Sequence, residues 1–189
     1  MTEYKYKVTD LLNYALRQNM YYSKKGVLSF PAEEIGLLKD YVSMCNRYSL
    51  KHDKYPQNVE KAHNIASKNI RVLENSTKKN DVFVKAINAY KPLACEKGDY
   101  LILVPNSISE LVQEGNQLNH CIGSYVDNIV SGKSKIFFLR RKDESKASFV
   151  TIELNSRNEF IEAREAYNNL PSEDVLRLIK SWSKACIGK

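Results

Sequence analysis

The chain has 189 residues, of which 43% are hydrophobic, and its formal net charge is +7. This length is sufficient for one well-formed core, or for a main domain with a small helical addition. No apolar stretch is long enough to span a bilayer, and the N-terminus has neither a hydrophobic signal segment nor a cleavage site. We therefore expect a soluble cytoplasmic protein with no membrane partner.

The excess positive charge lies entirely in the first half of the chain. Residues 1–91 hold 16 Lys and Arg against 9 Asp and Glu, whereas residues 92–189 hold 13 of each. Nine of the twelve tyrosines also lie in this half, and basic side chains interleaved with aromatic ones are typical of RNA-binding surfaces. Solvated lysines and core tyrosines would give the same composition. The four cysteines are too widely separated for a CxxC metal site, so we expect free thiols.

The first half is predicted to be helical except for one hairpin. Thr9 and Asp10 can cap a helix that ends near Asn19. Residues 20–31 then predict a basic β-hairpin, because β-favouring residues flank a Ser-Lys-Lys-Gly turn. Apolar residues at helical spacing predict three further helices, at 33–50, at 58–75 with Asn58 as the cap, and at 81–90.

The second half has the pattern of an α+β domain. Its predicted elements are a strand at 99–104, a helix capped by Ser107 and terminated by Gly115, a short helix closed by Gly132, strands at 135–142, 147–155 and 159–167, and a helix after Ser172. The last three strands predict an antiparallel meander. We expect an α+β fold: a helical region over 1–92 with a hairpin near 20–30, and a small, mainly antiparallel sheet packed with helices over 93–189.

Motifs in a fixed order make the chain similar to a known family. They are Tyr55-Pro56, Ala62-His63, Pro105, Glu114-Gly115, Leu118, His120-Cys121-Ile122-Gly123, Tyr125, Gly132, Arg140, Thr151-Ile152-Glu153, Arg164, Asn168 and a Trp-bearing last helix. Over about residues 55–182 this pattern resembles the PcfJ-like family, which is named for a protein of conjugative plasmids. The resemblance implies a role in plasmid or phage biology. The family usually shows Gln-x-Arg-Gly where this chain has Glu162-Ala163-Arg164-Glu165, so two carboxylates are added here.

A compact PcfJ-like protein also resembles the anti-CRISPR proteins of plasmids and phages that disable Cas9. Among these is a type whose N-terminal β-hairpin supports truncation of the guide RNA. This narrower resemblance implies that the partner is RNA, or the Cas9–guide RNA complex, in a bacterial host cell.

Residues 114–125 (EGNQLNHCIGSY) are the predicted centre of any chemistry. Cleavage of RNA by internal transfer needs a base at the 2′-hydroxyl, an acid at the departing 5′-oxygen and a cation on the phosphate. His120 is the candidate base or acid, Glu153 or Glu162 its partner, and Arg140 or Arg164 the phosphate clamp. A turn near 156–158 would pair Glu153 with a residue near 161–162 across two strands.

A metal-dependent scheme is the alternative. It gathers Glu114, Glu153, Glu162 and Glu165 around Mg²⁺, with His120 activating a water molecule. Both schemes compete with a structural interpretation, in which His120 is a buried histidine bonded to a strand and Glu162 with Arg164 is a surface ion pair.

The predicted nucleic-acid contacts lie at the hairpin and at a strand end. They are Tyr21, Tyr22, Lys24, Lys25, Arg140 and Arg141. Three functions are compatible with these residues: an RNase that truncates guide RNA, a non-catalytic nucleic-acid-binding or conjugation accessory protein, and an inhibitor that binds Cas9 directly. Shortened RNA, salt-sensitive binding to intact RNA, and Cas9 association without RNA would distinguish them.

Overall fold

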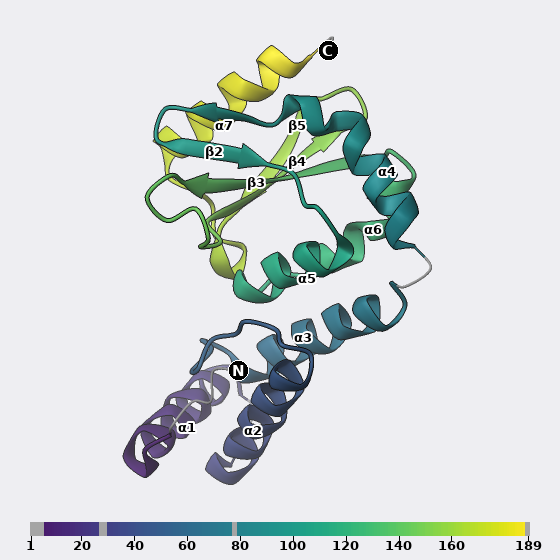
Figure 1. Cartoon of the computed structure of the whole chain (residues 1–189). Helices are drawn as coiled ribbons and strands as arrows, with labels where there is room; N and C mark the ends of the chain where they lie inside the picture. Colours follow the sequence, from purple (N-terminus) through teal and green to yellow (C-terminus); the bar gives the residue numbers. More distant parts are fainter. Residues whose placement is uncertain (1–5, 27–29, 77–78, 188–189) are drawn as a thin grey trace.

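The computed structural model describes residues 6–26, 30–76 and 79–187 of the chain (Figure 1). Its helices are α1 (Val8–Ser23), α2 (Pro31–Arg47), α3 (Val59–Glu74), α4 (Asn80–Tyr90), α5 (Ile108–Gln117), α6 (Val126–Val130) and α7 (Glu173–Cys186), with short 3₁₀ turns η1 (Lys91–Leu93), η2 (Ile122–Tyr125) and η3 (Ala166–Asn168). Its strands are β1 (Cys95–Lys97), β2 (Tyr100–Leu103), β3 (Ser134–Arg141), β4 (Val150–Asn155) and β5 (Phe160–Arg164). The α+β class and the helical first half are thereby confirmed. No helix in the described ranges is both long and apolar enough to cross a membrane.

The predicted β-hairpin at 20–31 is wrong in its first arm. Residues 20–23 form the last turn of α1, Lys24 to Gly26 form a turn in which Gly26 has a φ of +73°, and residues 27–29 lie outside the described residues. The reason is burial: Tyr14, Gln18 and Tyr22 follow one another at helical spacing and all face the interior. Pro31 begins α2, since its missing N–H costs nothing in the first turn of a helix.

Helix α3 begins where the sequence predicts. The side-chain Oδ1 of Asn58 accepts a hydrogen bond from the backbone N–H of Lys61 at 2.6 Å, which satisfies one free donor of the first turn. One face of α3 is buried through Val59, Ala62, Ala66 and Ile70. The helix lies between the α1–α2 pair and the rest of the chain (Figure 1), and its residues at 61, 64 and 68 remain exposed.

The five strands form one antiparallel sheet in the order β1-β2-β3-β4-β5. The predicted meander of β3, β4 and β5 is confirmed. Strand β1 was not predicted, because its three residues Cys95-Glu96-Lys97 show no apolar alternation. It pairs with β2 through a tight turn at Gly98, whose φ is +58°.

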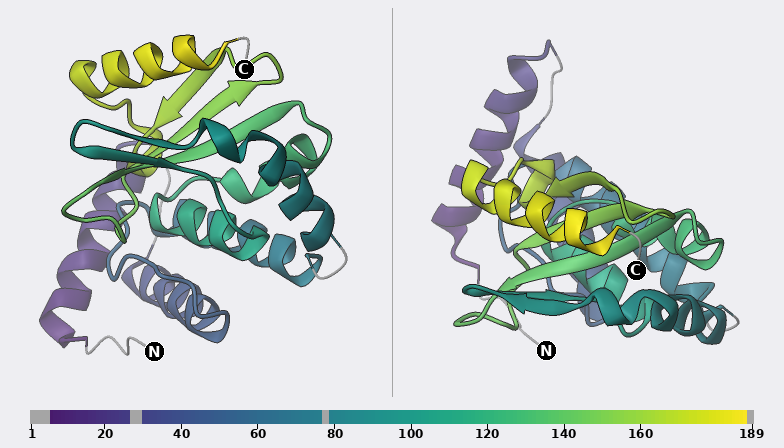
Figure 2. Two further views of the ribbon diagram at one scale, coloured as in Figure 1. Left: turned by 45° about the horizontal axis from the view of Figure 1, so that its top comes forward. Right: turned by 90° about the horizontal axis from the view of Figure 1, so that it is seen from above.

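The two faces of the sheet have different partners. Phe137, Ile152 and Ala163 occupy one face, where Phe137 meets Trp182 of α7 edge to face with ring centroids 4.8 Å apart. Figure 2 shows α7 lying along the sheet on this side. The opposite face presents Thr151 and Glu153 of β4 toward α5 and η2, because successive strand residues point to opposite sides.

Candidate functional site

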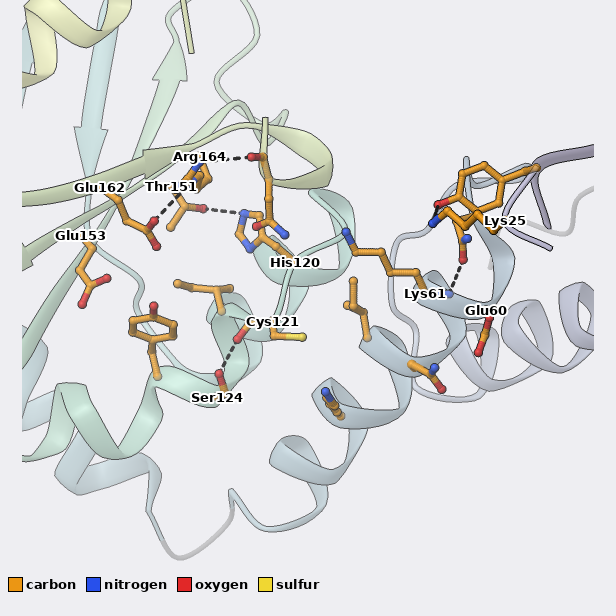
Figure 3. Close-up of a pocket in the computed structure, with 18 residues that line it drawn as sticks. Lys25, Glu60, Lys61, His120, Cys121, Ser124, Thr151, Glu153, Glu162 and Arg164 are labelled. Atoms are coloured by element: carbon orange, nitrogen blue, oxygen red, sulfur yellow. Dashed lines mark hydrogen bonds and ion pairs between the residues drawn. The ribbon is translucent and has the colours of Figure 1, made fainter. Parts of the chain in front are cut away.

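A cavity of about 590 Å³ separates α3 from the polar face of β4 and β5 (Figure 3). Its lining comes from the end of α1, from α3, from the 120–125 segment and from the last two strands: Tyr21, Lys25, Asn58, Glu60, Lys61, Asn64, Ile65, Lys68, His120, Cys121, Ile122, Ser124, Tyr125, Thr151, Glu153, Glu162, Arg164 and Asn168. The structure thus brings His120 together with Glu153, Glu162 and Arg164.

His120 reaches this cavity because the chain reverses after α5. Asn119 has a φ of +52°, and the N–H of His120 then donates to the carbonyl oxygen of Gly115 at 2.9 Å. A Cβ atom on Gly115 would lie 2.8 Å from the carbonyl oxygen of His120 and 2.8 Å from a methyl carbon of Ile122. Gly115 therefore permits a close approach. The prediction that it terminates the helix is wrong, since α5 continues to Gln117.

The imidazole of His120 is only 5% exposed and lies 3.3 Å, Nε2 to Oγ1, from Thr151 of β4. Burial lowers the pKa of His120 to about 4, although the carboxylate of Glu162 acts in the opposite direction. The ring is consequently neutral near neutral pH, so it can act as a base that accepts a proton but not as an imidazolium acid that donates one. The contact with Thr151 is typical of a structural histidine, but His120 also lines the cavity.

The two strand carboxylates lie directly opposite each other, as the sequence predicts. Glu153 of β4 pairs with Glu162 of β5, and Thr151 with Arg164, on the same face of the sheet. Each carboxylate accepts a hydrogen bond from a neighbouring side chain: Ser134 Oγ donates to Glu153 at 2.6 Å, and Arg164 Nε donates to Glu162 at 3.0 Å.

Tyr125 adds a hydroxyl group to this wall. Burial first, and then the charges of Glu153 and Glu162, raise the pKa of the Tyr125 phenol. It therefore remains a proton donor beside the carboxylates. Sequence reasoning noted Tyr125 within the motif but gave it no part in the chemistry.

The opposite wall of the cavity is basic. Lys61 extends from α3 toward His120 in Figure 3, and Lys68 lines the cavity two turns further along the helix. Lys25 Nζ donates to the hydroxyl of Tyr21 at 2.7 Å and lies 4.4 Å from the centre of that ring. This hydrogen bond lowers the pKa of Tyr21.

Only part of the predicted nucleic-acid surface lies at this wall. Tyr21 and Lys25 line the cavity, whereas Tyr22 is buried and bonds Asn58 at 3.4 Å, and the exposed Lys24 is not part of the lining. Sequence reasoning missed Lys61 and Lys68. Their signal was present in their spacing, which places both on the exposed face of one predicted helix.

Glu114 and Arg140 do not join this group, which corrects their predicted place. Arg140 Nη1 donates to Glu114 Oε1 at 2.8 Å, its Nη2 bonds the other carboxylate oxygen, and Ser148 Oγ donates to Glu114 at 2.6 Å. Glu114 is 2% and Arg140 7% exposed, so neither can meet a solvent-borne phosphate. Arg141, the next residue along β3, is exposed and lies over the ring of Phe149, away from the cavity lining.

The four carboxylates of the magnesium scheme do not converge. Glu114 is paired inside the protein and Glu165 does not line the cavity, which leaves Glu153 and Glu162 there with Glu60 on the opposite wall. Within the described part of the chain, no three His, Cys, Asp or Glu side chains are grouped closely enough to hold a metal ion.

Comparison with known proteins identifies the family. The family model described as PcfJ-like protein matches residues 37–178, which is most of the chain. The chain belongs to the PcfJ-like family. A Listeria innocua protein described as uncharacterized is 25% identical to this PcfJ-like chain over an alignment of 156 residues, which covers 79% of this chain and 34% of the relative. The chain thus spans about a third of the length of the curated relative it matches. No solved structure matches it.

The residues that line the cavity lie partly inside and partly outside the region matched by the family model. His120, the two strand carboxylates, Arg164 and the α3 lysines all fall inside the PcfJ-like region at 37–178. Tyr21 and Lys25 lie before it, on α1 and the turn that follows. Most of the cavity lining therefore belongs to the PcfJ-like region, and the end of α1 with the following turn supplies Tyr21 and Lys25.

Proposed function

We propose that this PcfJ-like protein is an anti-CRISPR-type ribonuclease of a mobile element, which inhibits Cas9 by truncating its guide RNA. One observation supports the cleavage chemistry above the others: a single cavity is lined by a neutral imidazole, a guanidinium group, two facing carboxylates and the lysines of α3. The choice of Cas9 guide RNA as substrate follows from the resemblance to compact anti-CRISPR proteins.

In the proposed reaction His120 is the base. Its neutral ring accepts the proton of a ribose 2′-hydroxyl, and Thr151 holds the imidazole in place through the 3.3 Å contact at Nε2. The 2′-oxygen attacks the adjacent phosphorus, and the bond to the 5′-oxygen breaks. Arg164 and Lys61 stabilise the charge that develops on the phosphate oxygens. The leaving 5′-oxygen receives its proton from the hydroxyl of Tyr125, which lines the cavity and keeps its proton beside Glu153 and Glu162, and the imidazolium of His120 then returns a proton to the phenolate.

Incubating the full-length protein with Cas9 and guide RNA tests this proposal on a denaturing gel. The wild-type protein is expected to shorten the RNA, with and without EDTA, because the proposed steps use side chains alone. His120→Asn is expected to abolish the shortening. Glu159→Gln is the control, since the half-exposed Glu159 lies just before β5, pairs with Arg157 and does not line the cavity. Intact guide RNA in the wild-type lane would refute the proposal.

A second candidate is a non-catalytic RNA-binding or conjugation accessory protein. The observation that favours it is the low exposure of His120, whose contact with Thr151 would also suit a purely structural ring. This candidate predicts salt-sensitive mobility shifts with RNA that stays intact. An inhibitor that binds Cas9 directly predicts association that survives removal of the RNA.

A further inference from the structure

Helix α3 carries a row of polar side chains that extends beyond the cavity. Lys61, Asn64, Lys68, Arg71 and Asn75 follow at spacings of three and four residues, and all five are exposed. Such spacing places them along one side of the helix. With a rise of 1.5 Å per residue, the row from Lys61 to Asn75 is about 21 Å long. It includes three cations and no carboxylate.

The far end of this row borders a second hollow of about 300 Å³. Arg71 of α3 and Asn75, which caps the C-terminal end of α3, line it on one side, and Gly123, Ser124 and Asp127 line it from the segment after His120. Ser124 lines both hollows, so the second hollow lies next to the first along α3. Lys61 and Lys68 belong to the first hollow and Arg71 to the second.

The cations of this row are available for a ligand. Among the described residues, none of Lys61, Lys68 and Arg71 takes part in an ion pair. The carboxylate of the second hollow, Asp127, already pairs with Lys79 at 2.7 Å. The row therefore presents three cations that are in no ion pair beside two adjacent hollows, which is complementary to a chain of phosphates.

We propose that Lys61, Lys68 and Arg71 form a track for single-stranded RNA, which holds the phosphates on one side of the cleaved bond. This inference rests on the proposed ribonuclease function and names a subsite for its substrate. Lys61 contacts the RNA phosphate nearest His120, and Lys68 and Arg71 contact the phosphates of the nucleotides that continue into the second hollow. The contacts are to phosphates, so the track binds without regard to base sequence.

The test is binding of a short 2′-O-methyl oligonucleotide, measured by fluorescence anisotropy over a range of salt concentrations. This ligand keeps its phosphates but has no free 2′-hydroxyl, so binding is measured without cleavage. Each phosphate contact on a single strand contributes about 0.7 to the slope of log affinity against log salt concentration. The double variant Lys68→Gln/Arg71→Gln is therefore expected to lower the slope by about 1.4.

Lys180→Gln/Lys184→Gln is the matched control. It removes two exposed charges from α7, on the other side of the sheet, and is expected to leave the salt slope unchanged. An unchanged slope in the Lys68/Arg71 variant would overturn the track. So would tighter binding of polyglutamate than of RNA, with the same dependence on Lys68 and Arg71, because the row would then serve an acidic protein.

The two proposals fail separately. If the wild-type protein leaves guide RNA intact but the Lys68/Arg71 variant shows the lower slope, the track stands and the ribonuclease proposal is refuted. If the protein truncates guide RNA but the slope is unchanged, the ribonuclease proposal stands and the track is refuted.

Discussion

The buried pair of Glu114 and Arg140 gives the sharpest test of this structure. Arg140→Met removes a guanidinium that makes two hydrogen bonds to Glu114. The carboxylate of Glu114, only 2% exposed in the native protein, would stay in the interior without this partner. Only Ser148 would then remain as its partner. Loss of one member of a buried ion pair costs about 3–5 kcal/mol, because the other charge stays in the interior without compensation. For a chain of this size, that cost lowers the melting temperature by about 6–20 °C.

Removing both charges should cost much less. We expect Glu114→Leu/Arg140→Met to recover at least about 2 kcal/mol relative to Arg140→Met alone, because no charge is then left in the interior. Urea unfolding followed by far-ultraviolet circular dichroism and by Trp182 fluorescence measures both values. Trp182 is the single tryptophan of the chain and is 4% exposed, so its emission reports on the core beneath α7.

An exposed ion pair supplies the control for these variants. Arg177 and Asp174 of α7 are 73% and 85% exposed, and pairs of this kind contribute little to stability. Arg177→Met is expected to change the free energy of unfolding by less than about 0.5 kcal/mol. If Arg140→Met costs no more than Arg177→Met, the buried pair does not exist as described.

Three further predictions concern the pH dependence, the glycines and the thiols. The pKa of His120 is about 4 in the folded chain and near 6.5 when unfolded, so the unfolded state binds more protons between these values and stability falls as pH is lowered through this window. His120→Gln should weaken that fall, as pH-dependent urea midpoints would show. Gly123→Ala should destabilise the protein by about 1–3 kcal/mol, because the new Cβ would lie 2.8 Å from Asn69 Oδ1. Gly36→Ala places its Cβ within 4 Å of nothing and should stabilise α2 by up to about 1 kcal/mol. Thermal melts of the two variants test both values. Burial raises the pKa of the Cys45 thiol to about 12, so a thiol-specific reagent should label the exposed Cys95 in the native protein and Cys45 only on unfolding.

Local signals explain what the sequence predicts correctly. The cap at Asn58, the meander of the last three strands and the pairing of Glu153 with Glu162 each depend on residues close together in the chain. The alternation of residues along β4 likewise places Ile152 and Leu154 on the face opposite Thr151 and Glu153, and both are fully buried. In these places, neighbouring residues and the period of the element agree with the final packing.

Long-range packing explains what could not be predicted. Residues 20–23 favour a strand locally, yet Tyr22 is buried between α1 and α3 and the helix continues through them. Glu114 meets Arg140 across 26 residues, and nothing near either residue indicates that pairing. The basic side of α3 becomes a cavity wall only because the 120–125 segment and the sheet are placed against it.

The segment from Glu114 to His120 shows how one motif serves two purposes. Glu114 binds Arg140 beneath α5, and the reversal at Asn119 returns His120 toward Thr151 on the same face of the sheet. The ion pair thus fixes α5 on the sheet next to the site without entering the cavity. A variant of Arg140 that lost RNA truncation would therefore not identify a catalytic residue. The activity of such a variant is informative only below its own melting temperature, where any remaining loss would come from displacement of His120.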